Sequence, residues 1–231
     1  MQKKDLIFGS VIILLFLPVF LIEPLLDAYK TFNQQHGMIM SFVKFAVLAT
    51  LGEVIGLRIK TGEYNKTGFG ILPRALVWGL LGLTIQMAFV IFSVGTPQFL
   101  AYLGLEHAPA AFNAPGFSTM KLLVAFSISA AMNLIYAPVM MTLHKITDTH
   151  IENNGGTLAG LLQPINIGEI MAGINWKVQW SFVFRKTIPF FWIPAHTITF
   201  LLPADYRVLF AAILGIVLGV LLAVAAILGK K

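Results

Sequence analysis

The residues that could do chemistry in this chain are a few polar side chains set within long apolar segments. Glu53 follows Gly52 near the end of one apolar run, and Arg74 opens the next. An ionisable residue costs about 2.5–3.5 kcal/mol at the centre of a membrane helix, so such residues usually pair or mark a pathway. We therefore expect Glu53 to pair with Arg74 or with Arg185. The alternative is a helix-end carboxylate that reaches the interface or makes a purely structural salt bridge.

Further polar groups occur in the later apolar runs. Asn133 and His196 lie within such runs, Thr199 follows three residues after His196, and Arg207 directly precedes the last run. These groups could line a passage for polar solutes, with Arg207 at its outer mouth. The alternative is hydrogen bonding between helices, which is worth about 0.6 kcal/mol on average. For His196 that alternative is a neutral ring bonded to a neighbouring helix.

Motifs for metal binding and catalysis are missing from the sequence. The chain has no cysteine, and its five histidines show no spacing such as H-E-x-x-H. Nucleophile and phosphate-loop patterns such as G-x-S-x-G and G-x-x-x-x-G-K are also absent. We therefore expect no metal, no cofactor and no enzymatic activity.

The composition indicates a membrane protein. Of 231 residues, 58% are hydrophobic and 11% are charged, whereas soluble domains average about 45–50% apolar and about 25% charged residues. A spanning helix needs about 20 mostly apolar residues. The expected fold is an all-α polytopic transmembrane helical bundle, a single membrane domain over residues 1–231. Its expected spans are about six: Leu6–Leu26, Met38–Leu57, Leu72–Val94, Met120–Leu143, Thr187–Leu202 and Val208–Leu228.

The distribution of basic residues predicts the orientation. A cytoplasmic N-terminus places 12 of the 16 Lys and Arg residues on the inner side, as the positive-inside rule requires. Both termini are then cytoplasmic. The net charge of +6 is explained by cytoplasmic loops, so no nucleic-acid partner is expected. The expected partners are the lipid bilayer and a small polar solute, and a homo-oligomer is left open. The basic residues not on the inner side are Lys30, Lys44, Lys121 and Arg207.

Short motifs in a fixed order carry a family resemblance. They are Asn175-Trp176, then Trp192 to Phe200, then Pro203 to Arg207. Together they resemble the signature of the Mpv-seventeen and 22-kilodalton peroxisomal membrane protein family: N-W, then W-P-x-x-Q-x-x-N-F, then P-x-x-Y-R. Further matches lie upstream, at Gly52-Glu53, at Arg74 with Gly79, and at Asn133 with Pro138. The resemblance covers residues 38–226 and leaves an additional N-terminal span over residues 1–30.

The resemblance implies a small multi-span protein of a family discussed as channels for small solutes and metabolites. We accordingly expect a channel or carrier-like pathway for small polar solutes. The alternative is a structural or accessory membrane subunit without transport activity. The extra N-terminal span and the short loops suit a bacterial inner membrane. His196 stands where the family has Gln, and Thr199 where it has Asn, so the family's selectivity need not carry over. The residues expected to form the pathway or its gate are Glu53, Arg74, Asn133, His196, Thr199 and Arg207.

Overall fold

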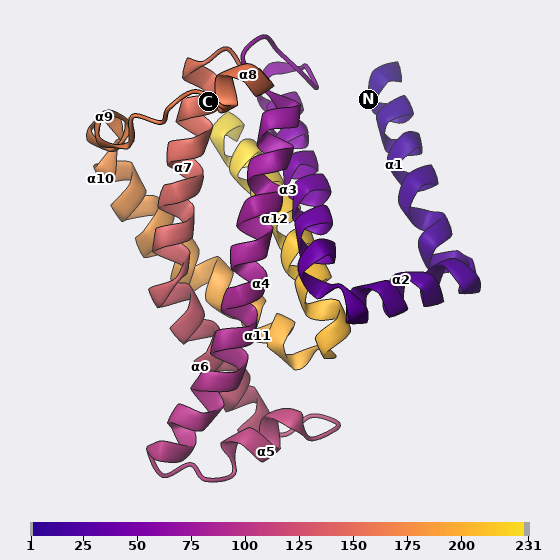
Figure 1. Ribbon diagram of the computed structural model, residues 1–231, viewed down its shortest axis with the longest axis vertical. Coiled ribbons are helices and arrows are strands. Elements are labelled where there is room, and N and C mark those ends of the chain that lie inside the picture. The colour runs from indigo at the N-terminus through magenta and orange to yellow at the C-terminus, as the bar shows by residue number, and fades with distance from the viewer. Residues whose placement is uncertain (1, 229–231) are drawn as a thin grey trace. The chain divides into compact units, whose positions relative to one another are not determined.

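The computed structural model describes residues 2–228, and every regular element in that range is a helix (Figure 1). The contacts divide the chain into two units, one ending at Met40 and the other beginning at Ser41. The first unit holds α1 (Lys3–Leu21) and α2 (Glu23–Gln35). The expected first span ends early, at Leu21, because the backbone turns at Ile22. Pro24 then occupies the first turn of α2, where its missing N–H costs no hydrogen bond.

The second unit holds the rest of the chain. The helix α3 begins just before the boundary between the units and runs into the second one. The elements are α3 (Gly37–Thr61), α4 (Ile71–Tyr102), α5 (Ala108–Asn113), α6 (Thr119–Ile135), α7 (Ala137–Asn153), α8 (Leu158–Leu161), α9 (Ile167–Gly173), α10 (Trp176–Val178), the π-helix η1 (Gln179–Trp192), α11 (Ile193–Leu201) and α12 (Ala204–Leu228).

The second unit has two distinct ends (Figure 1). At one end, which we call the mouth end, α3 and α7 finish and α4 begins. The loops there are in close contact, since a Cβ added to Gly70 would lie 2.9 Å from Gly156 Cα. At the opposite end, the far end, α4 finishes and α6 and α12 begin. Arg207 of α12 lies there against Phe112 of α5, with its guanidinium carbon 4.7 Å from the ring centroid.

Within the described residues, four helices are long and apolar enough to cross a membrane: α1, α3, α4 and, over Ala204–Leu221, α12. A fifth span is counted if α6 and α7, which are bent by 43° relative to each other, cross together. This is consistent with an integral membrane protein, but it does not reach the expected number of about six. The expected span Met120–Leu143 is interrupted at Tyr136, because Pro138 in the first turn of α7 has no N–H to continue the helical ladder.

The expected span Thr187–Leu202 belongs to a longer run of a different kind. Helical structure continues without a break from Trp176 to Leu201, through α10, η1 and α11. These segments have 3, 14 and 9 residues, so none alone is long enough to be counted as a span. Two prolines, Pro189 and Pro194, lie in this run. Each lacks an N–H donor, which favours the wider hydrogen-bonding pattern that η1 adopts.

Small residues let the spanning helices of the second unit approach closely, as the spacing of Gly79 and Gly82 predicts. A Cβ added to Gly82 would lie 2.8 Å from both Phe45 Cβ and the Ser41 carbonyl oxygen. The Ser41 hydroxyl donates a hydrogen bond of 2.7 Å to the Gly82 carbonyl. Closer to the C-terminal end of α3, a Cβ added to Gly52 would lie 2.9 Å from Ile216 Cα of α12. A side chain at either glycine would therefore clash with the neighbouring helix.

Candidate functional site

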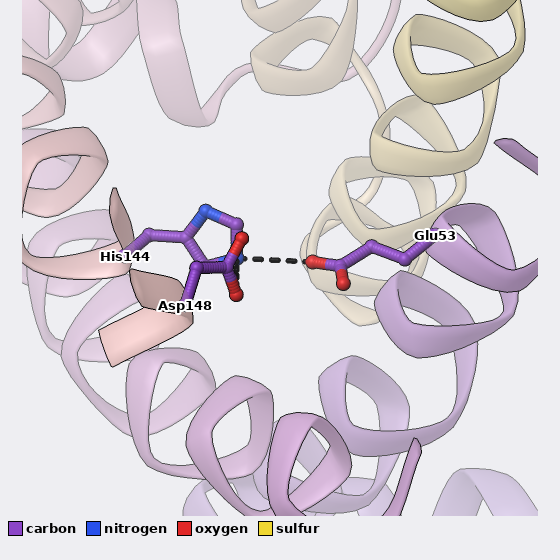
Figure 2. Close-up of side chains that lie close together, drawn as sticks. All are labelled: Glu53, His144 and Asp148. Carbon is purple, nitrogen blue, oxygen red and sulfur yellow. Dashed lines mark hydrogen bonds and ion pairs between the residues drawn. The ribbon is translucent and has the colours of Figure 1, made fainter. Parts of the chain in front are cut away.

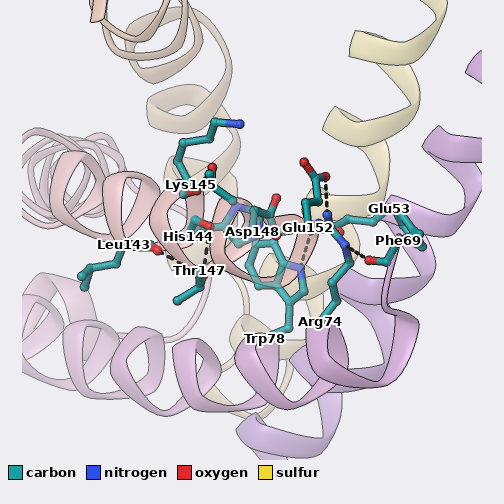
Figure 3. A network of polar contacts seen from close by, with 11 residues as sticks. Glu53, Phe69, Arg74, Trp78, Leu143, His144, Lys145, Thr147, Asp148 and Glu152 are labelled. Carbon is teal, nitrogen blue, oxygen red and sulfur yellow. Dashed lines mark hydrogen bonds and ion pairs between the residues drawn. The ribbon is translucent and has the colours of Figure 1, made fainter. Parts of the chain in front are cut away.

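A buried arginine organises the polar residues near the mouth end (Figure 3). Arg74, in the first turn of α4, is only 3% exposed. Its Nη1 donates to Glu53 Oε2 and to Asp148 Oδ1, both at 2.6 Å, and its Nη2 donates to Glu152 Oε1 at 2.8 Å. Its Nε donates to the Phe69 carbonyl at 2.7 Å. The expected Glu53–Arg74 pair is therefore formed, and two further carboxylates join it.

Glu53 is held from its other side by two ring nitrogens. Its Oε1 accepts a hydrogen bond of 2.7 Å from Trp78 Nε1 and lies 3.0 Å from His144 Nε2 (Figure 2). His144 Nε2 is also 3.5 Å from Asp148 Oδ1. The Trp78 and His144 rings lie against each other, with centroids 4.2 Å apart. These residues, Glu53, Arg74, Trp78, His144, Asp148 and Glu152, form what we call the Arg74 network.

The Arg74 network joins three helices. Glu53 comes from α3, Arg74 and Trp78 come from α4, and the remaining members come from α7. Side chains four residues apart share one helix face, so His144, Asp148 and Glu152 project from α7 toward the same partners. Sequence reasoning missed these three because it ended the fourth span at Leu143. The H-x-x-x-D-x-x-x-E spacing was the signal that could have found them.

Three members of the network have the ligand types that metals use. One ligand atom each from Glu53, His144 and Asp148 lie within 4.8 Å of one another (Figure 2). Carboxylate and imidazole groups bind Zn²⁺ and related ions. The Nη1 atom of Arg74, however, lies 2.6 Å from both carboxylates. A metal ion would have to displace this guanidinium, so the arrangement described here is an ion-pair network.

A cavity of about 610 Å³ adjoins the Arg74 network. That volume is within the range of about 300–1,000 Å³ that is usual for ligand sites. Its lining at the mouth end includes the exposed residues Lys60, Lys66 and Lys145. Away from the mouth end, the lining includes Asn133 of α6 and His196 of α11. Glu53, Arg74, Asn133 and His196, four of the residues expected to form a pathway, thus border one cavity.

The polar side chains away from the mouth are partly used by their own helices. Asn133 is 2% exposed, and its amide nitrogen donates a hydrogen bond of 2.9 Å to the Ser129 carbonyl. His196 is 7% exposed and stacks on Trp192, with ring centroids 5.3 Å apart. Thr199 is fully buried, and its hydroxyl donates 3.0 Å to the Ala195 carbonyl of the same helix. It does not line the 610 Å³ cavity.

Aromatic rings separate this cavity from the far end. Phe89 lies 5.6 Å from His196 and 5.0 Å from Phe200, which is fully buried. Beyond this aromatic layer, Arg207 packs over Phe112, and its Nε donates 2.9 Å to the Leu202 carbonyl. Arg207 lines a second cavity of about 460 Å³ instead of the first. The structure therefore does not bring Arg207 together with the other expected pathway residues.

Between residues 2 and 228 the fold is all-helical, with several helices apolar enough to span a membrane and a cavity between them. Comparisons with protein-family models, with curated proteins and with solved structures found no match to this chain. The resemblance to the Mpv-seventeen family therefore stays a prediction from sequence. The function is inferred from the geometry of the cavity and its lining.

Proposed function

We propose that this protein is a carrier-like membrane pathway for small solutes. The single observation that carries the proposal is the 610 Å³ cavity, which borders exposed lysines at the mouth end and reaches buried His196 and Phe89. A cavity of this size between apolar helices, with a few polar groups on its walls, is the usual form of a small-molecule site. In this proposal a solute enters from the mouth end.

The aromatic layer favours a carrier over an open channel. Phe89, Phe200 and His196 lie between the two cavities, with ring centroids 5.0 and 5.6 Å apart. A solute in the first cavity must displace these rings to reach the far end. Passage therefore requires a second conformation in which α4 and α11 separate at this layer. On the opposite side, the Arg74 network ties α3, α4 and α7 together and so holds the mouth end in its present arrangement.

The orientation and membrane follow as part of the same proposal. Lys60, Lys66 and Lys145 surround the mouth end, so the positive-inside rule assigns that end to the cytoplasm. The continuous run from α10 to α11 would then supply a further crossing, and both termini would be cytoplasmic. We further propose that the protein lies in a bacterial inner membrane. We also propose that it is related to the Mpv-seventeen family.

A second function is favoured by how completely Arg74 is bonded. Four of its N–H groups have acceptors at 2.6–2.8 Å. A network used only to hold three helices together would look the same. In that case the protein is a structural or accessory subunit that moves no solute.

Reconstitution into liposomes separates these two functions. We expect saturable uptake and counterflow of labelled small solutes, tested with an amine, a carboxylate and a neutral polyol. Met140 lines the cavity and Leu80 faces outward with 58% exposure. Met140→Trp should fill the cavity and reduce uptake, whereas Leu80→Trp should leave it unchanged. Equal uptake by protein-free liposomes and by both variants would support the accessory role.

A further inference from the structure

We propose that the cavity binds amphipathic organic cations, with an ammonium group among the carboxylates of the Arg74 network and an apolar body against the aromatic walls. This inference rests on the proposed function, because it names the solute class of the same cavity. Three observations lead to it: the balance of charge in the network, the rings that line the cavity, and buried polar groups that lack partners.

The charge balance favours a cation. Three carboxylates, from Glu53, Asp148 and Glu152, surround the single guanidinium of Arg74. One oxygen of Asp148 and one of Glu152 accept no hydrogen bond from any residue between 2 and 228. These oxygens can accept N–H donors from a ligand. A protonated His144 would still leave the carboxylates in excess.

The same network disfavours an anion. Arg74 is the buried cation on the cavity lining, but four of its five N–H groups are already engaged by three carboxylates and the Phe69 carbonyl. The other cations on the cavity lining are Lys60, Lys66 and Lys145, all of which are exposed. Solvent and salt screen exposed charges more strongly than partly buried ones. Glu53 and Asp148, whose side chains are only 18% and 19% exposed, therefore weigh more in the selectivity than the exposed lysines.

The walls of the cavity suit an apolar or aromatic body. Trp78, Phe89, Tyr136, Phe182 and Trp192 all line it. Aromatic faces attract both apolar groups and cations, and the attraction for a cation is about 0.5–2 kcal/mol according to how far it is desolvated. A small, fully hydrated ion would gain little from these rings. A molecule with an apolar body and a positive head would use both parts of the cavity.

Two amides on little-exposed residues of the cavity lining supply the independent sign of a ligand. Gln179 is 8% exposed and lines the cavity, yet its side chain makes no hydrogen bond to any described residue. The Asn133 amide nitrogen is bonded to Ser129, but its oxygen, on a residue only 2% exposed, has no donor in the described chain. Buried polar groups are normally hydrogen-bonded. The amide oxygens of Gln179 and Asn133 are therefore ready acceptors for a ligand N–H.

The test compares three probes that share one apolar body. They are 4-phenylbutylammonium, 4-phenylbutanol and 4-phenylbutyrate, titrated calorimetrically into the purified full-length protein in neutral detergent. We expect saturable binding, with an affinity for the ammonium probe at least tenfold higher than for the carboxylate probe. A tenfold difference corresponds to about 1.4 kcal/mol. Tighter binding of the carboxylate would overturn the inference in favour of recognition by the lysines. Equal binding of all three would reduce the site to an apolar cavity.

Two variants locate the binding site within the protein. The Glu152 side chain is 57% exposed, so Glu152→Gln should fold normally. It should weaken binding of the ammonium probe by about two- to fivefold, as expected for a partly exposed ion pair, and leave the alcohol unchanged. Glu169→Gln removes the same charge from an exposed residue on α9 outside the cavity lining and should change neither. Equal weakening by both substitutions would contradict binding at the network.

The third variant tests the unpartnered amide. Gln179→Met keeps the length of the side chain and removes both polar amide atoms. It should weaken binding of the ammonium probe more than binding of the alcohol probe. Uptake into liposomes is measured on the same preparations. Binding without uptake would retain the cation site and overturn the proposed transport. Uptake of other solutes without binding of the ammonium probe would support the proposed transport and overturn the cation site.

Discussion

The two ends of the 610 Å³ cavity are built from opposite chemistry. At the mouth end, Arg74 and three carboxylates meet at 2.6–2.8 Å and tie together α3, α4 and α7. Toward the far end, Phe89, Phe200 and His196 meet through their rings, at 5.0–5.6 Å between centroids. Charged bonds depend on direction and on full pairing, whereas ring contacts depend mainly on area.

This difference shows which end can open more easily. Separating the Arg74 network would leave partly buried charges without partners, and breaking one partner from a buried pair costs about 3–5 kcal/mol. Sliding aromatic rings apart costs about 0.5–1.5 kcal/mol for each pair beyond the loss of buried area. We therefore expect the network to set stability and the aromatic layer to set passage.

The largest expected effect is at Arg74. Arg74→Ala leaves three carboxylates close together without their cation, and we expect it to lower the free energy of unfolding by about 3–5 kcal/mol. Thermal unfolding in detergent measures the change. Arg74→Lys keeps the charge but cannot reproduce the forked geometry, so it should recover only part of the loss. A full recovery would show that charge alone matters and that the directed bonds do not.

A double-mutant cycle sharpens this comparison. Glu53→Gln should be destabilising in the wild-type protein and much less so in the Arg74→Ala background. Residues in one network typically show coupling energies of about 0.5–3 kcal/mol, and a bond of 2.6 Å between partly buried charges favours the upper part of that range. If the two losses simply add, Glu53 and Arg74 do not act as a pair.

The helix contact at Gly82 comes next. Gly82→Ala would place a methyl group 2.8 Å from Phe45 Cβ and from the Ser41 carbonyl, and overpacking of this kind costs about 1–3 kcal/mol. Gly95 lies on the same helix with nothing within 4 Å. Gly95→Ala should therefore be neutral or stabilising, by up to about 1 kcal/mol. Equal effects at the two positions would contradict the close approach of α3 and α4.

The smallest stability effect is expected in the aromatic layer. Phe200→Leu removes the ring contact with Phe89, and we expect a loss of about 0.5–1.5 kcal/mol beyond the change in buried area. Its effect on function should be larger, because a thinner layer allows leakage of solute between the cavities. Solute leakage from proteoliposomes measures this. A variant that is strongly destabilised but does not leak would place Phe200 in the core and not in a gate.

Sequence reasoning reached the membrane class and the Glu53–Arg74 pair because both follow from local rules. The charge-poor composition indicates a membrane protein. The cost of an isolated ion in a membrane span predicts that Glu53 and Arg74 pair. It missed His144, Asp148 and Glu152 because it ended the helix at Leu143, whereas α7 continues to Asn153. It also grouped Thr199 and Arg207 with the cavity. Only the tertiary packing of α11 and α12 shows that neither residue lines it.

The central claim, a cavity entered from one end only, is tested most directly by the accessibility of a single cysteine. The chain has no native cysteine. Thr187→Cys is close in size and lies on the cavity lining. The exposed loop variants Thr67→Cys and Phe117→Cys mark the mouth end and the far end.

A membrane-impermeant methanethiosulfonate is applied to oriented membranes from either side. We expect Thr187→Cys to react from the side that labels Thr67→Cys and to be protected from the side that labels Phe117→Cys. Reaction from both sides would show an open pore. Reaction from neither side would show a packed core and would contradict the pathway altogether.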